Sequence, residues 1–144
     1  MRTNVVFRYP AEFVPLSFDD GVVATAGAQW FLTLLSRLSG VVIDGEMCQE
    51  DWGVVVFVRR CQTKFWIGLS AWSDGEGAWL AHFHHGSFPW LKKFSSSGRE
   101  ELRNLLVDFH HMLVNEPTVS DIVWHQESQM TRPNPESFDS PVEN

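Results

Sequence analysis

Apolar and polar residues follow one another along the chain with two periods, one typical of helices and one of strands. Between residues 22 and 38 the apolar positions recur at helical spacing, on a stripe made of Ala24, Ala28, Phe31, Leu35 and Leu38. Asp19-Asp20 suits the start of this helix and Ser39-Gly40 its end, whereas Gly27 lowers its helix propensity. The pattern predicts a helix over 22–38.

A second helical pattern lies near the end of the chain. Residues 97–100, Ser-Gly-Arg-Glu, form a capping box in which the Ser and Glu side chains can bond the first backbone N–H groups. The apolar face that follows consists of Leu102, Leu105, Leu106, Phe109 and Leu113. This helix is predicted to end before Pro117.

Between the two helices the apolar residues follow the spacing of strands. Four consecutive strands are predicted, over 41–48, 52–59, 63–72 and 78–84. The run Val54–Val58 is apolar throughout, which is typical of a central strand that is buried on both faces. The linkers are too short for parallel crossovers, so the four strands are expected to form an antiparallel meander.

Short strands over 4–8 and 121–125 complete the predicted order, (β)-α-β-β-β-β-α-(β). This order indicates a two-layer α+β fold, with an antiparallel sheet of four to five strands and both helices on one face. We expect one domain over 1–125. Residues 126–144 contain three prolines and few apolar residues, so they are predicted to form a flexible tail.

Composition limits the partners that this domain can have. The chain of 144 residues is 44% hydrophobic, which suffices for one core, and its seven Trp are too many to bury fully. Eleven basic and 18 acidic residues leave a net charge of −7. This charge argues against nucleic acid and anionic membrane surfaces as partners, and it favours a basic protein.

Cysteine usage and the first residues point to the compartment. Cys48 and Cys61 are the two cysteines, and they form no Cys-x-x-Cys motif. The first ten residues lack the apolar region and cleavage site of a signal peptide, and no stretch has the length of a membrane helix. We therefore expect a cytoplasmic protein with free thiols.

Histidines provide the first candidate site. His82 and His84 lie two residues apart on a predicted strand, so they point to the same face and could bind one metal ion. A third ligand could be His125 or an acidic side chain of a neighbouring strand. The His-x-His pattern is similar to that of cupins, but Phe88 and Pro89 stand where cupins have a Glu. The alternative is a pair of strand histidines without a ligand, which we favour, and no cofactor is expected.

Catalytic constellations are absent from the sequence. Neither Cys lies at a predicted helix N-terminus, where the pKa of its thiol would fall, and no Gly-x-Ser-x-Gly motif is present. The paired carboxylates fall in predicted turns and caps, where Asp and Glu serve local hydrogen bonding. A hydrolase that uses Cys or His therefore has little support, and the chain is not expected to be an enzyme.

Tryptophans provide the second candidate site. On the strand over 63–72, Phe65, Ile67, Leu69 and Ala71 form the core face, which places Trp66 on the open face. If the hairpins pair in simple register, Trp79 falls on the same face, and Trp52 lies beside it. An open sheet face with large aromatic residues is typical of a binding surface. The alternative is that these Trp pack under loops or under the tail.

Acidic residues provide the third candidate feature. Asp44, Glu46, Glu50 and Asp51 are close in sequence, and Asp44 and Glu46 are expected on one face of the strand over 41–48. They could form a recognition surface for a basic protein. The alternative, which the pattern favours, is an ordinary solvated edge that discourages strand pairing between molecules.

Together these features favour a small non-enzymatic protein-binding module. The predicted surface consists of Asp44, Glu46, Glu50, Asp51, Trp52, Trp66 and Trp79. In size and layout the chain resembles small bacterial immunity proteins that neutralise a toxin, and acidic chaperones that hold an effector. The four consecutive strands favour the immunity type. A metal or small-ligand site at His82 and His84 is the alternative, and the open face would also allow a homodimer.

Overall fold

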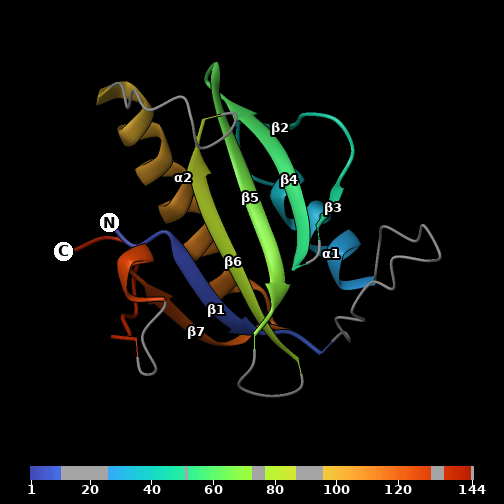
Figure 1. Ribbon diagram of the computed structural model, residues 1–144, viewed down its shortest axis with the longest axis vertical. Coiled ribbons are helices and arrows are strands. Elements are labelled where there is room, and N and C mark those ends of the chain that lie inside the picture. The colour runs from blue at the N-terminus through green and yellow to red at the C-terminus, as the bar shows by residue number, and fades with distance from the viewer. Residues whose placement is uncertain (11–25, 51, 73–76, 87–95, 131–134, 144) are drawn as a thin grey trace.

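The sheet and its helices are described by a computed structural model over residues 1–10, 26–50, 52–72, 77–86, 96–130 and 135–143 (Figure 1). Seven strands and two α-helices are present in these ranges. The strands are β1 (Asn4–Arg8), β2 (Val41–Ile43), β3 (Cys48–Glu50), β4 (Gly53–Arg60), β5 (Thr63–Ala71), β6 (Ala78–His85) and β7 (Ser120–His125). The helices are α1 (Ala26–Ser36), α2 (Ser96–Asn115) and a short 3₁₀ turn, η1 (Glu127–Gln129).

All strand pairs are antiparallel, and the predicted meander is confirmed for β4, β5 and β6. The turn between β4 and β5 consists of two residues, Cys61 and Gln62, with φ angles of 47° and 66°. Positive φ at both central residues is the geometry of a type I′ turn, whose twist matches that of the strands it joins. The turn sets the register Arg60 opposite Thr63, which extends to Val54 opposite Leu69.

The strands outside the meander are arranged in an order that the sequence pattern leaves open. The strand order is β2-β4-β5-β6-β1-β7, so the first strand of the chain lies between β6 and the last strand. The strand predicted over 41–48 is divided into β2 and β3, which pair in turn with the same edge of β4. Gly45, with a φ of +90°, bends the chain between them. Asp44 and Glu46 therefore do not share a strand face, contrary to the expectation.

Both helices cover one face of the sheet, as predicted, and Figure 1 shows them behind the strands. Alternate residues of β4, β5 and β6 supply the core side of the sheet: Val54, Val56, Val58, Phe65, Ile67, Leu69, Trp79, Ala81 and Phe83, each at most 1% exposed. Phe31 and Leu35 of α1 and Phe109 of α2 belong to the same buried cluster. Burial of these large side chains against one face is the main stabilising contribution.

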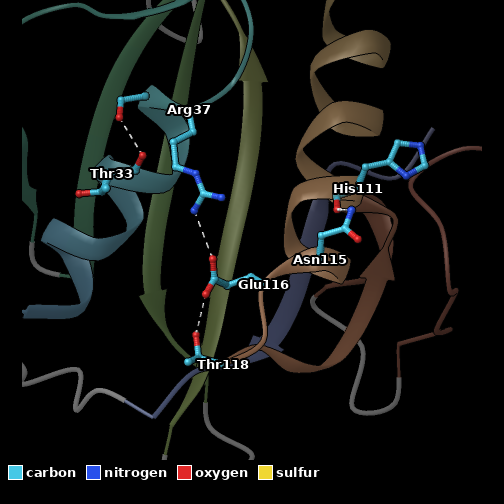
Figure 2. Close-up of polar contacts among 7 residues, drawn as sticks. Thr33, Arg37, His111, Asn115, Glu116 and Thr118 are labelled. Carbon is cyan, nitrogen blue, oxygen red and sulfur yellow. Dashed lines mark hydrogen bonds and ion pairs between the residues drawn. The ribbon is translucent and has the colours of Figure 1, made fainter.

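Polar contacts join the two helices to each other and to the sheet. Arg37, just after α1, donates to Glu116, just after α2, over 3.3 Å, and Thr118 donates to the same carboxylate over 3.1 Å (Figure 2). The guanidinium of Arg60 on β4 bonds Asp108 on α2 over 2.6 Å. The contacts of Glu116 tie the C-terminal ends of the two helices together, and the pair of Arg60 and Asp108 ties the body of α2 to β4.

Part of the C-terminal segment packs along β7. Trp124 and Phe138 exchange two backbone hydrogen bonds, of 2.7 and 3.0 Å. The Arg2 guanidinium lies 3.6 Å from the centre of the Phe138 ring, and its backbone N–H donates to Pro141 over 2.8 Å. The predicted division of the chain into a domain over 1–125 and a flexible tail over 126–144 is a statement about motion, so it stays a prediction.

Candidate binding surface on the open sheet face

The face of the sheet opposite the helices carries the second set of alternating side chains. Pairing between strands places Phe57, Trp66 and His84 in one row across β4, β5 and β6. The next row consists of Val55, Gly68 and His82. Trp66 therefore lies on the open face, as the sequence predicts, and it lies directly opposite His84.

Four rings on this face form a contiguous group, which we call the Trp–His cluster: Trp52, Trp66, His82 and His84. Trp66 stacks on His84, with ring centres 3.9 Å apart and an interplanar angle of 11°. His82 meets Trp52 edge to face at 4.9 Å and Trp66 at 5.5 Å. Each ring is thus held by at least one neighbour, so the cluster is ordered before any partner arrives.

Gly68 makes this packing feasible. A Cβ atom at position 68 would lie 1.7 Å from Nε2 of His82 and 2.7 Å from Cη2 of Trp52. The absence of a side chain lets the imidazole lie directly on the backbone of β5. Gly68 is not among the residues predicted from the sequence, although a glycine inside an otherwise apolar strand is a recognised sign of close approach.

Burial keeps the two imidazoles of the cluster neutral. Desolvation lowers the pKa of His82 to about 4, and the neighbouring His84 contributes in the same direction. Desolvation also lowers the pKa of His84, an effect opposed by Glu127, whose Oε1 lies 3.9 Å from Nδ1 of His84. At neutral pH the cluster therefore presents uncharged aromatic surface.

An acidic edge adjoins the cluster. Asp44, Glu46 and Glu50 are all exposed, and Asp51 lies outside the described residues. The backbone N–H of Asp44 donates to Phe57 over 2.8 Å, and Glu50 pairs with Gly53, next to Trp52. Backbone pairing therefore places these residues along the edge of β4 that is opposite to β5.

The charge differs at the far end of the face. Arg59 and Lys64 are opposite each other beside the β4–β5 turn, and Lys64 and Arg59 are both exposed. Trp52, at 42% exposed, lies toward the other end, near the carboxylate of Glu50. The open face thus combines an acidic edge, an aromatic centre and a basic end.

Trp79 lies in the core and not on the open face, so its predicted place on the binding surface is wrong. It is 0% exposed, and a Cβ atom on Gly27 of α1 would lie 2.0 Å from its Cη2 atom. The register pairs Ala71 with Trp79 and Trp66 with His84, which puts the two Trp on opposite faces. Gly27, which weakens the helix pattern, is where α1 approaches the Trp79 ring.

The three histidines of the predicted metal site are not brought together. Asn4 of β1 pairs with His82 on one side and with His125 on the other, so two strand spacings separate the two histidines. His125 is buried, and its Nδ1 lies 2.9 Å from the carbonyl oxygen of Glu136. In the described part of the chain, no group of three or more His, Cys, Asp or Glu side chains is placed to hold a metal ion.

The two thiols lie on the surface near this face. Cys48 pairs across β3 and β4 with Val55, and Cys61 belongs to the β4–β5 turn. Both are exposed and free. They occupy different ends of β4, so the structure does not bring them together.

The character of the helices and the comparisons with known proteins complete the description. No described helix combines the length and the apolar character needed to cross a membrane. The chain matches no protein-family model, no curated protein and no solved structure. The geometry of the open face is therefore the basis for a functional conclusion.

Proposed function

We propose that this protein is a non-enzymatic binding module that contacts a basic protein through the open face of β4, β5 and β6. The observation that carries the proposal is the position of Trp52 and Trp66 on the sheet face opposite to α1 and α2, in a sheet whose β2–β3 edge carries the exposed residues Asp44, Glu46 and Glu50. A large aromatic centre beside charged residues is the usual anatomy of a protein interface.

Order in the Trp–His cluster supports this function. The stacking of Trp66 on His84 and the packing of Trp52 on His82 restrict both indole rings before binding. Rings that are already ordered lose little conformational entropy in a complex, so more of their contact energy contributes to affinity. Trp is also the residue type most enriched among the side chains that dominate binding energy.

The acidic edge supports a basic partner. Its carboxylates and the net charge of −7 attract a positively charged surface and raise the rate of encounter. Within this class, we propose an immunity-type protein that neutralises a toxin in the cytoplasm. Its alternative is an acidic effector chaperone. A neutraliser abolishes the activity of its bound partner, whereas a chaperone releases a partner that is still active.

Native mass spectrometry after gentle capture from the producing cell tests this proposal. We expect a one-to-one complex with a basic chain, and we expect Glu46→Lys to weaken it at least about tenfold, through loss of attraction and added repulsion. Glu100→Lys is the matched control, because Glu100 is also exposed but lies on α2, in the other layer.

Three outcomes would overturn the proposal. They are the absence of any stoichiometric partner, a complex that Glu46→Lys leaves intact, and equal weakening by Glu46→Lys and Glu100→Lys. A mass increment that corresponds to a metal ion, without a protein partner, would support instead the small-ligand alternative at His82 and His84.

A further inference from the structure

The C-terminal segment, residues 135–143, lies against the fold in the manner of a bound peptide. In the described part of the chain, β7 is the last strand of the sheet, so its outer side is a sheet edge. Trp124 of β7 and Phe138 exchange two backbone hydrogen bonds across this edge, as an extended peptide does when it adds to a sheet. The segment is thus a covalently attached occupant of the β7 edge.

Arg2, which directly precedes β1, provides the second part of this contact. Its guanidinium lies 3.6 Å from the centre of the Phe138 ring and donates to the carbonyl oxygen of Ser140 over 3.0 Å. Its backbone N–H donates to the carbonyl oxygen of Pro141 over 2.8 Å, and Figure 1 shows the two chain ends side by side. Arg2 is 7% exposed, and these contacts compensate for the burial of its charge.

His125, at the end of β7, provides the third part. It is buried, and its Nδ1 donates to the carbonyl oxygen of Glu136 over 2.9 Å. The carboxylate of Glu143 lies 3.8 Å from the Arg2 guanidinium but is 77% exposed, so it adds little. The segment is therefore held through its backbone, which any sequence offers, and through the ring of Phe138, which provides selectivity.

None of these contacts requires that the site and the segment belong to the same chain. If a second copy supplies the segment, the same hydrogen bonds and the same ring contact form, so the two arrangements differ mainly in the entropy of association. A segment on a short tether has an effective concentration of about millimolar at its own site. In dilute solution the chain's own segment therefore fills the site.

We propose that Arg2, Trp124 and His125 form a peptide site that accepts the C-terminal segment of a second copy, so that two copies exchange segments and form a homodimer. The chain's own segment blocks this site in the monomer, and weakening of that contact within one chain makes the site available. The exchange goes beyond the proposed interface on β4, β5 and β6 and does not depend on it.

Two variants of the full chain test this proposal when they are mixed. Phe138→Ala keeps the site but weakens the segment, whereas Arg2→Gln keeps the segment but weakens the site. Only the mixture combines an intact site that has no strong competitor with an intact segment. We expect native mass spectrometry and sedimentation to show a heterodimer, with a dissociation constant at least about tenfold below that for self-association of either variant.

Asp139→Ala is the matched control for Phe138→Ala. Asp139 follows Phe138 in the segment, is exposed, and contributes no side chain to the contacts described above. The Asp139→Ala chain therefore keeps its own segment in its own site. Its mixture with Arg2→Gln should form no more dimer than the wild type does.

A labelled peptide of residues 135–144 provides a second measurement. It should bind Phe138→Ala at least about tenfold more tightly than it binds the wild type, in which the chain's own segment competes. The same peptide with Ala in place of Phe138 should bind Phe138→Ala much more weakly. Circular dichroism checks that each variant is folded, and Phe138→Leu, which lacks the ring beside the guanidinium, replaces Phe138→Ala if that variant unfolds.

The proposal is overturned if the folded Phe138→Ala and Arg2→Gln variants stay monomeric when mixed. It is also overturned if the mixture with Asp139→Ala forms as much heterodimer, or if the peptide binds the wild type and Phe138→Ala equally. Each result is obtained without the protein partner of the open face, so the exchange and the proposed interface stand or fall separately.

Discussion

At position 68, a side chain of any size would occupy the space in which the His82 ring lies. The imidazole takes that space, and Trp52 packs on it from the loop before β4. Its Nε2 atom is buried and has no hydrogen-bond partner among the described residues. The position of the His82 ring therefore depends on the glycine at position 68, and burial of this ring keeps it neutral.

Gly68→Ala should disturb this packing. The added methyl group overlaps His82 and Trp52, so the rings must move, and overpacking of this kind costs about 1–3 kcal/mol of unfolding free energy. Urea unfolding followed by Trp fluorescence measures the loss. Ser70→Ala, at a half-buried position on the same face of β5, is the control and should cost less. An unchanged stability of Gly68→Ala would contradict the packing described above.

The lowered pKa of His82 predicts a loss of stability in mild acid. The pKa of His82 is about 4 in the folded chain, below the ordinary value of 6.5, so the unfolded chain binds a proton more readily between these two pH values. Stability should therefore be fully present above pH 6.5 and decrease as the pH falls toward 4. Because His82 is partly exposed, the loss at pH 5 should be no more than about 2 kcal/mol.

Urea unfolding at pH 7 and pH 5 provides the measurement. His82→Gln removes the titrating group and should show a smaller difference between the two pH values than the wild type. The remaining difference reports other histidines, including His84 and His110, whose pKa values burial also lowers. If His82→Gln and the wild type lose equal stability, His82 does not titrate in this range.

At the scale of elements, α2 is joined to the sheet by contacts of different burial. Its Asp108 pairs with Arg60 of β4, whose side chain is 13% exposed, and its His110 accepts a hydrogen bond of 3.2 Å from the buried Trp124 of β7. By contrast, the pair of Arg37 and Glu116 lies at the helix ends, and Arg37 is 59% exposed there. Burial decides how much each pair stabilises the docking of the helices.

Asp108→Ala should therefore destabilise the fold more than Arg37→Ala does. Removal of Asp108 leaves the Arg60 guanidinium, mostly buried, without its carboxylate, at a cost of about 1–3 kcal/mol. Removal of Arg37 takes away a guanidinium that is 59% exposed from a carboxylate that also accepts from Thr118, so the loss should be about 0.2–1 kcal/mol. Chemical unfolding of both variants at neutral pH gives the two values, and the reverse order would show that burial does not decide them.

At the scale of the whole molecule, the two faces of the sheet assign different roles to the tryptophans. Trp79 contributes to the core under α1, whereas Trp66 lies on the face opposite to α1 and α2. The sequence contains both residues in similar strand contexts. Their separation results from the pairing of β5 with β6, which neither segment determines alone.

Substitution of Trp79 and of Trp66, one at a time, should distinguish a residue that mainly stabilises the fold from one that mainly contributes to binding. Trp79→Ala leaves a large cavity in the core and should cost about 3–5 kcal/mol of unfolding free energy. Trp66→Ala should cost less, and it should weaken the complex with the protein partner by about tenfold or more. Circular dichroism and the native mass spectrum measure these effects, and a Trp66→Ala variant that is folded and still binds normally would contradict the proposed interface.

The sequence by itself determined the local elements and the class of the fold. The apolar stripe of the second helix, the alternation of Phe65, Ile67 and Leu69, and the short linker between the strands predicted over 52–59 and 63–72 all lie in contiguous residues. Periodicity and linker length therefore suffice to predict them. The position of Trp66 on the open face follows from the same alternation.

The tertiary structure alone decided which distant segments meet. Four features depend on strand register and on contacts between residues far apart in the sequence. They are the insertion of β1 between β6 and β7, the burial of Trp79, the separation of His125 from His82, and the contact between Arg2 and Phe138. A shift of register by one residue moves every side chain of a strand to the other face of the sheet. Local patterns do not specify the register of a strand when aromatic residues can be placed on both faces of the sheet.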